Sequence, residues 1–178
     1  MKLAVCVLSV PVRFTIVVAT GLWPVHSAPA FHTRETARRA VATAVSATDL
    51  PAGFAKGSLT YDDTNAELKF AAAFVDQKDE RKPIVLVISD QKLPVEKWES
   101  EFDMMIDHSK WSGVVFFLDK DGKFFRSDVH MNGRQSSVSG IFELKTDNLS
   151  SKDLTGTART SADGKETKID AAFHATLK

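Results

Sequence analysis

The sequence predicts an α+β fold that is mainly antiparallel β, with about eight strands in a curved sheet or barrel and one amphipathic helix packed on it. From Lys56 onward, apolar and polar residues alternate with period two, which is typical of half-buried strands. Residues 84–88 and 114–118 are apolar throughout, which indicates two strands covered on both faces. Between them, one stretch carries apolar residues at helical spacing.

The first pair of strands is predicted at residues 58–61 and 67–74, joined by a turn at residues 62–65. Asp and Asn are favoured in that turn because their side chains bond to nearby backbone groups. We expect one face of the second strand to carry Leu68, Phe70, Ala72 and Phe74.

The helix is predicted over residues 95–110, directly after Pro94, and is expected to lie across strands 84–88 and 114–118. Its buried stripe is expected to contain Val95, Trp98, Phe102, Met105 and Ile106.

Four more strands are predicted at residues 123–131, 136–145, 154–160 and 168–177, with breaks at residues 132–133, 146–148 and 162–164. In the last strand, alternate residues are expected on one face, namely Ile169, Ala171, Phe173, Ala175 and Leu177. The aromatic residues Phe116, Phe117, Phe124, Phe125 and Phe142 either form the core or line a cavity.

The stretch Asp119-Lys120-Asp121-Gly122 has the appearance of a calcium loop. An EF-hand alignment on Gly122 places Phe117 at the first ligand position, and the flanking segments are strand-like rather than helical. We therefore expect Asp121-Gly122 to form a tight hairpin turn.

Residues 1–30 have the layout of a secretory signal peptide, with a short apolar run after Arg13 and small residues at Ala28-Pro29-Ala30. Cleavage is expected after Ala30; the alternative is an uncleaved anchor. Residues 31–55 are interpreted as a tether with a short helix around residues 36–46, and residues 56–178 as a single β-rich domain. The mature chain is then periplasmic or secreted, without a stable membrane span.

The chain has 23 Lys and Arg against 23 Asp and Glu, a balance that disfavours nucleic acid as a partner because phosphate contacts need clustered basic residues. The one cysteine, Cys6, lies in the predicted leader, so the mature chain is expected to be free of cysteine. Disulfides and cysteine metal sites are then excluded.

The histidines have no metal-ligand spacing, and no cofactor or specific metal site is expected. Met104 and His108 lie four residues apart on the side of the predicted helix away from Trp98, and a second His-Met pair occurs at His130-Met131. Thioether and imidazole groups bind soft metals. These four residues are the candidate ligand or partner face.

The serines have no nucleophile-elbow motif, and the acidic residues of the predicted helix alternate with lysines as on a solvated face. No catalytic constellation is visible, so the chain is not expected to be an enzyme.

The segments KGSLTY, LKFAAAF, IVLVISDQKLP, VVFFLDKDGKF, LTGTART and IDAAFHATL, within residues 56–177, resemble an uncharacterised family of small exported bacterial β-rich proteins. The resemblance implies export and a β-rich fold, with no activity to transfer. The family more often has a His-x-Tyr-Ala-like pattern at the end of the second strand, where Phe70 and Ala72 stand here.

The sequence thus predicts an exported, non-enzymatic binding or interaction module for an unknown protein partner. The alternative is a carrier of a small apolar ligand inside the curved sheet.

Overall fold

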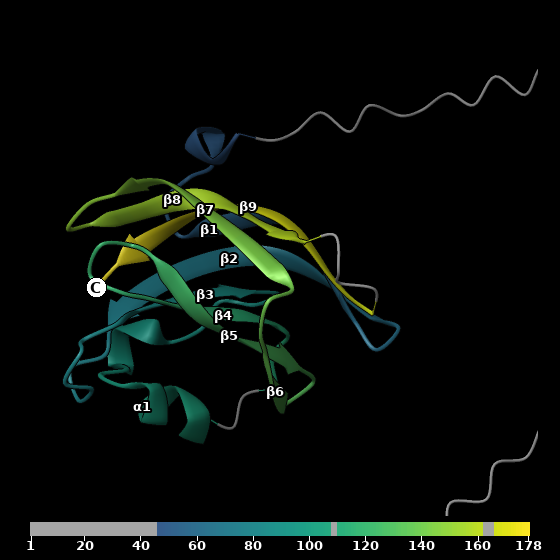
Figure 1. The fold of residues 1–178 in the computed structure, drawn as a ribbon, viewed down its shortest axis with the longest axis horizontal. Coiled ribbons are helices and arrows are strands. Elements are labelled where there is room, and N and C mark those ends of the chain that lie inside the picture. The colour runs from purple at the N-terminus through teal and green to yellow at the C-terminus, as the bar shows by residue number, and fades with distance from the viewer. Residues whose placement is uncertain (1–45, 108–109, 162–165) are drawn as a thin grey trace, which may run out of the picture. The chain divides into compact units, whose positions relative to one another are not determined.

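Nine β-strands form one curled sheet, a half-barrel, in the part of the chain that the computed structural model describes, residues 46–107, 110–161 and 166–178 (Figure 1). The strands are β1 (Phe54–Tyr61), β2 (Thr64–Val75), β3 (Ile84–Ser89), β4 (Gly113–Leu118), β5 (Phe124–Met131), β6 (Arg134–Val138), β7 (Phe142–Leu149), β8 (Asp153–Thr160) and β9 (Thr167–Leu177). One short α-helix, α1 (Glu101–Ile106), and two 3-10 helices, η1 (Ala47–Asp49) and η2 (Val95–Lys97), complete the described elements. The predicted fold class, mainly antiparallel β, is confirmed.

The strand order is β6-β5-β4-β3-β2-β1-β9-β8-β7, so the open edges of the sheet are β6 and β7. Neighbouring strands in this order are antiparallel. Beyond the start of β1, β2 also pairs with β9 in parallel, through Ala72 with Thr176 and Ala73 with Leu177. The predicted signal peptide and almost all of the predicted helix at residues 36–46 lie outside the described residues.

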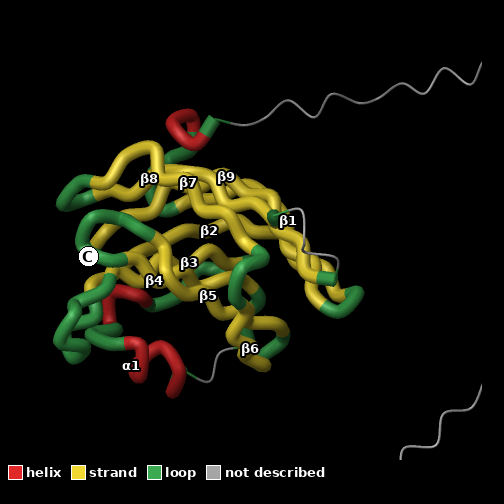
Figure 2. Tube along the Cα trace, in the orientation of Figure 1, coloured by secondary structure: helices red, strands yellow, loops and turns green. Residues whose placement is uncertain are grey.

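The inner face of the curl is filled by a hydrophobic core to which all strands except β6 contribute buried residues. Strands β7 to β9 lie on one side of this core and β3 to β5 on the other, with the helical segments outside the curl (Figure 2). The expected inner face of β9 is confirmed, because Ile169, Ala171, Phe173 and Ala175 all belong to this core. Three of the expected core aromatics, Phe116, Phe124 and Phe142, also pack here.

A second, smaller core lies on the outer face of β2, β3 and β4. The connection between β3 and β4 covers it, which explains why both strands are buried along their whole length, as the apolar runs predicted. The buried residues of this outer core are Phe74, Val85, Val87, Leu93, Val95, Trp98, Met104, Trp111, Val115 and Phe117.

The predicted single helix over residues 95–110 is wrong. The segment forms η2, an extended break at Trp98, and then α1, which starts only at Glu101. Ser100 caps α1, since its side chain accepts a hydrogen bond from Asp103 N at 3.3 Å, and Asp103 Oδ2 accepts one from Glu99 N at 2.9 Å. Ser100 is thus the N-cap of α1, and the Asp103 side chain reaches back to the residue before it; together these bonds separate the two helical pieces.

The break changes which residues face the sheet. Val95, Trp98 and Met104 are buried. In contrast, Phe102, Met105 and Ile106 are about half exposed or more. The predicted stripe is therefore correct up to Trp98 and wrong beyond it. Met104, which was predicted on the side of the helix away from Trp98, is instead buried with Trp98 in the outer core, because α1 is a separate helix that begins after the break.

The predicted face of β2 is also wrong in part. Leu68 faces the inner core as expected, but Ala71 and Ala73 follow it there, while Phe74 belongs to the outer core. The alternation reverses next to a register shift between β1 and β2, at residues 54–57 of β1. An irregularity of this kind bends a strand and changes the face of the residues beyond it.

The predicted strand at residues 136–145 is two strands, β6 and β7, separated by a turn at Gly140, whose φ is +73°. Conversely, the predicted break at residues 146–148 is absent, because β7 continues through it with a register shift against β8. The Asp121-Gly122 turn is confirmed: Asp119 Oδ1 accepts hydrogen bonds from Asp121 N and Lys123 N, and Gly122 has a φ of +80°.

Candidate functional site

A groove of about 540 Å³ opens on the outer side of the sheet, beside η2. Its lining comes from segments far apart in the sequence: the entry to β1, the middle of β2 and β3, the start of the β3–β4 connection, and the last residues of the chain. Volumes of roughly 300–1,000 Å³ with mainly apolar walls are typical of small-molecule sites. The lining residues are Ala52, Gly53, Phe54, Phe70, Ala71, Ala72, Ala73, Val87, Ser89, Lys92, Leu93, Val95, Glu96, Thr176, Leu177 and Lys178.

Small residues form the floor of the groove, and this leaves space above the sheet. Ala72 pairs with Val87 of β3, and its methyl group reaches only partly into the outer core. On the same strand, Phe70 packs against Phe54 with ring centroids 5.7 Å apart and the ring planes tilted by 33°, and Phe54 remains 44% exposed. An exposed aromatic ring beside an apolar hollow is available for contact with a ligand.

The wall at the entry to β1 is held by main-chain bonds. Gly53, with a φ of +88°, donates its N–H to His174 O at 2.7 Å and accepts from Ala71 N at 3.1 Å. His174 Nδ1 lies 2.8 Å from Leu50 O. The positive φ favours glycine at this position. Gly53 therefore sets the direction in which the chain enters β1 and forms this wall.

The opposite wall is η2 and the residues before it, of which Leu93 and Val95 are anchored in the outer core. Lys178 ties this wall to the end of β9. Its N–H donates to Ala73 O at 3.0 Å, and its ammonium donates to Glu96 O and, at 3.3 Å, to Trp98 O. Hydrogen bonds and buried side chains thus hold the groove on both sides.

Three charged side chains line the groove, namely Lys92, Glu96 and Lys178. All three residues are exposed, and within residues 46–107, 110–161 and 166–178 none forms an ion pair between side chains. Ser89, in contrast, is buried and its hydroxyl donates to Gln91 O at 2.8 Å. The groove therefore has an apolar interior and a charged rim.

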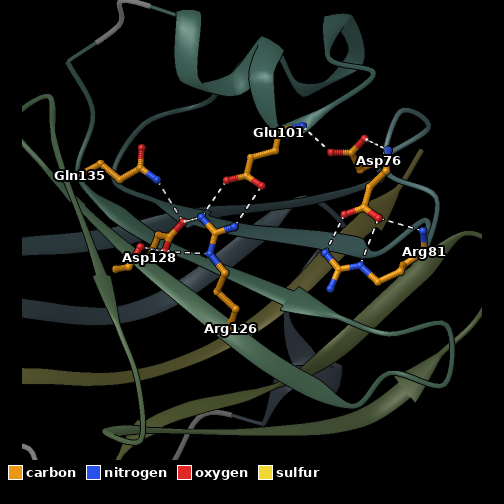
Figure 3. Close-up of polar contacts among 8 residues, drawn as sticks. Asp76, Arg81, Glu101, Arg126, Asp128 and Gln135 are labelled. Carbon is orange, nitrogen blue, oxygen red and sulfur yellow. Dashed lines mark hydrogen bonds and ion pairs between the residues drawn. The ribbon is translucent and has the colours of Figure 1, made fainter.

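A polar cluster lies on the same outer face, beneath α1 (Figure 3). The Arg126 guanidinium bridges Glu101 of α1, at 2.8 and 3.1 Å, and Asp128 of β5, at 2.5 and 3.3 Å. Asp128 is fully buried and also accepts hydrogen bonds from Gln135 and Ser137 of β6. Burial opposes the charge of Arg126, but the hydrogen bonds from its guanidinium to Glu101 and Asp128 outweigh it and raise its pKa.

This cluster attaches α1 to the sheet. The Arg126 guanidinium also lies 4.3 Å from the centre of the Phe117 ring, and Asp76 at the end of β2 accepts a hydrogen bond from Glu101 N at 2.7 Å. Every carboxylate of the cluster has a protein partner, an arrangement typical of a structural anchor. We assign it the role of positioning α1.

A smaller cavity of about 240 Å³ lies between the end of α1 and β5. His130 lines it, stacked on Trp111 with ring centroids 4.1 Å apart, and its Nε2 is buried and has no hydrogen-bond partner among the described residues. Burial lowers the pKa of His130 to about 4, against a smaller opposing effect of Asp128. The imidazole is therefore neutral at physiological pH.

The low pKa of His130 predicts a loss of stability in mild acid. In the unfolded chain a histidine titrates near a pKa of about 6.5, so between about pH 6.5 and 4 the unfolded state binds the proton and the folded state does not. Above about pH 6.5, the neutral His130 makes its full contribution to the free energy of unfolding. About 3 kcal/mol of that free energy is lost as the pH falls from there to about 4.

Urea unfolding at a series of pH values from about 7 to about 4 measures this effect. The control is His130→Phe, which keeps an aromatic ring on Trp111 and removes the titrating group. We expect the free energy of unfolding of this variant to decline less with acid than that of the wild type. Equal declines would show that His130 does not titrate abnormally.

The structure brings together two of the four residues predicted as a ligand or partner face. Met104 and His130 line the smaller cavity, while Met131 points to the opposite face of β5 and packs in the inner core. His108 lies outside the described residues. Among the described residues, no group of three or more His, Cys, Asp or Glu side chains is placed to hold a metal ion.

The residues of the apolar groove were not predicted from the sequence as a site. A local signal was present in the segment Phe70-Ala-Ala-Ala-Phe74, where three small residues separate two large ones, and in Phe54, which was assigned to the tether. No local sequence pattern predicts that Lys92 and Lys178 lie beside these residues, because only the order of the strands in the sheet brings them together.

Comparisons with protein families, curated proteins and solved structures find no match for this chain. No helix in the described part of the chain has the length and apolar character needed to cross a membrane.

Proposed function

We propose that this protein is a non-enzymatic binding module and that the apolar groove beside η2 is its binding site, which holds a small apolar ligand. The observation that carries the proposal is the groove itself, of about 540 Å³, with an exposed aromatic ring at its wall and anchored segments on both sides. We further propose, from the leader-like residues 1–30, that the protein acts in the periplasm or outside the cell.

The composition of the lining supports binding rather than catalysis. The hydroxyl of Ser89 is buried and bonded to a backbone carbonyl, and the ammonium of Lys178 is bonded to two others. No lining side chain is arranged as a nucleophile with an adjacent base, the arrangement that covalent catalysis requires. The groove also suits a small ligand better than a folded partner, because stable protein interfaces use about 20–30 residues on each side, more than the 16 that line the groove.

A carrier with its ligand inside the curl is the second candidate from the sequence. It has less support, because the inner face is filled by large, fully buried side chains such as Phe116, Phe173 and Leu86. The two candidates place the ligand on opposite faces of the sheet. A variant that fills only the outer groove therefore separates them.

The test is the binding of N-phenyl-1-naphthylamine, an uncharged apolar dye whose fluorescence rises in apolar surroundings. We expect binding to the wild type, and binding at least about tenfold weaker to Ala72→Leu, because the larger side chain occupies the floor. Ser58→Leu adds the same side chain to an exposed position of β1 outside the groove and serves as the matched control.

Thermal unfolding of both variants verifies that they fold. Phe54→Ala provides a second variant, which removes the exposed wall ring without adding volume and is also expected to weaken binding. Dye binding that is unchanged in both Ala72→Leu and Phe54→Ala would exclude the groove and favour a ligand inside the curl.

A further inference from the structure

The rim of the groove indicates the chemistry of its ligand, a step that rests on the proposed function. The interior is apolar, so each methylene group that a ligand buries there is stabilised by removal from water. The rim carries two ammonium groups, on Lys92 and Lys178, and one carboxylate, on Glu96. The side chains at the rim therefore leave one positive charge in excess.

The two lysines have different roles. The ammonium of Lys178 donates to the backbone oxygens of Glu96 and Trp98, which holds it against the wall of the groove. Lys92 is exposed, and within the described residues it has no hydrogen bond or ion pair from its side chain. It is therefore free to pair with an anionic group at the mouth of the groove, at little cost in rearrangement.

We infer that the groove binds a free single-chain amphiphile with an anionic head group, its alkyl tail on the floor around Ala72 and its head beside Lys92. A free molecule is favoured over a lipid in a membrane surface because the chain has equal numbers of basic and acidic residues, 23 of each. Recognition of an anionic membrane depends instead on clusters of lysine and arginine.

Isothermal titration calorimetry near neutral pH with three probes of equal chain length tests the inference: decanoate, decan-1-ol and decyltrimethylammonium. We expect decanoate to bind about two- to fivefold more tightly than decan-1-ol, the range of an exposed ion pair, and decyltrimethylammonium to bind most weakly. The preference is expected to shrink when salt is raised from about 0.05 M to about 1 M, since exposed charges are screened.

The charge variants make the test specific. Lys92→Glu should remove or reverse the preference for decanoate over decan-1-ol, and Glu96→Gln should increase that preference. Lys120→Glu, an equal change of charge in the turn between β4 and β5, is the matched control and should have no effect.

The outcomes separate this inference from the proposed function. Equal binding of all three probes, abolished by Ala72→Leu, would overturn the head-group inference and leave the groove as the binding site. No binding of any probe, or binding that Ala72→Leu does not weaken, would overturn both. Binding to phosphatidylglycerol vesicles without binding to decanoate would overturn the assignment of a free ligand.

Discussion

Replacement of Trp98 by alanine is expected to lower the free energy of unfolding by about 3–5 kcal/mol, as for other large buried aromatic residues. Trp98 is only 4% exposed and packs edge to face on Phe74, with ring centroids 5.9 Å apart. It is one of the residues by which the β3–β4 connection covers the outer core. Urea unfolding of the variant, followed by circular dichroism, measures the loss.

Phe102→Ala is the matched control for Trp98→Ala. Both aromatic residues lie on the stripe that the sequence predicted to be buried, yet Phe102 is 60% exposed. We expect this control to change stability by no more than about 0.5 kcal/mol. A loss as large as that of Trp98→Ala would mean that Phe102 is buried and that a continuous helix covers the sheet.

Asp128→Ala is expected to cost about 3–5 kcal/mol, because it removes one partner of a buried ion pair. The loss leaves Gln135 and Ser137 without their acceptor, and it takes from Arg126 the carboxylate that lies 2.5 Å away. The attachment of α1 through Arg126 and Glu101 should weaken with it. The free energy of unfolding and the protection of α1 amides in hydrogen exchange measure the two effects.

Asp147→Ala is the control for this variant, since it breaks an exposed ion pair with Lys145, at 3.2 Å, on the edge strand β7. Exposed pairs contribute about 0–1 kcal/mol, so the control should remain close to the wild type. If Asp128→Ala is equally mild, the cluster beneath α1 does not anchor the helix.

Several features of the fold were predictable from local patterns. The runs at residues 84–88 and 114–118 indicated strands covered on both faces, and the alternation along residues 168–177 indicated the inner face of β9. The Asp121-Gly122 turn was predictable because few residues other than glycine adopt the positive φ that it requires. In each case, the residues that cause the feature lie within one short segment of the chain.

The errors arose where two local signals compete. The apolar stripe from Val95 to Ile106 favours one helix, whereas Ser100 and Asp103 favour a helix start in its middle, and the capping bonds prevail. In β2, the alternation from Leu68 to Phe74 is interrupted beside the register shift, which depends on the partner strand β1. The residue pattern within one strand does not show how that strand pairs with its neighbour.

The sequence by itself determined the mainly antiparallel β class and the two buried central strands, because hydrophobic period and turn chemistry act over a few residues. Only the tertiary structure decided the groove. Phe54, Ala72, Lys92 and Lys178 meet there because β1 lies between β2 and β9, and because the end of β9 reaches η2. Those contacts join residues as far apart in the sequence as Phe54 and Lys178, and sheet pairing, rather than any local preference, brings them together.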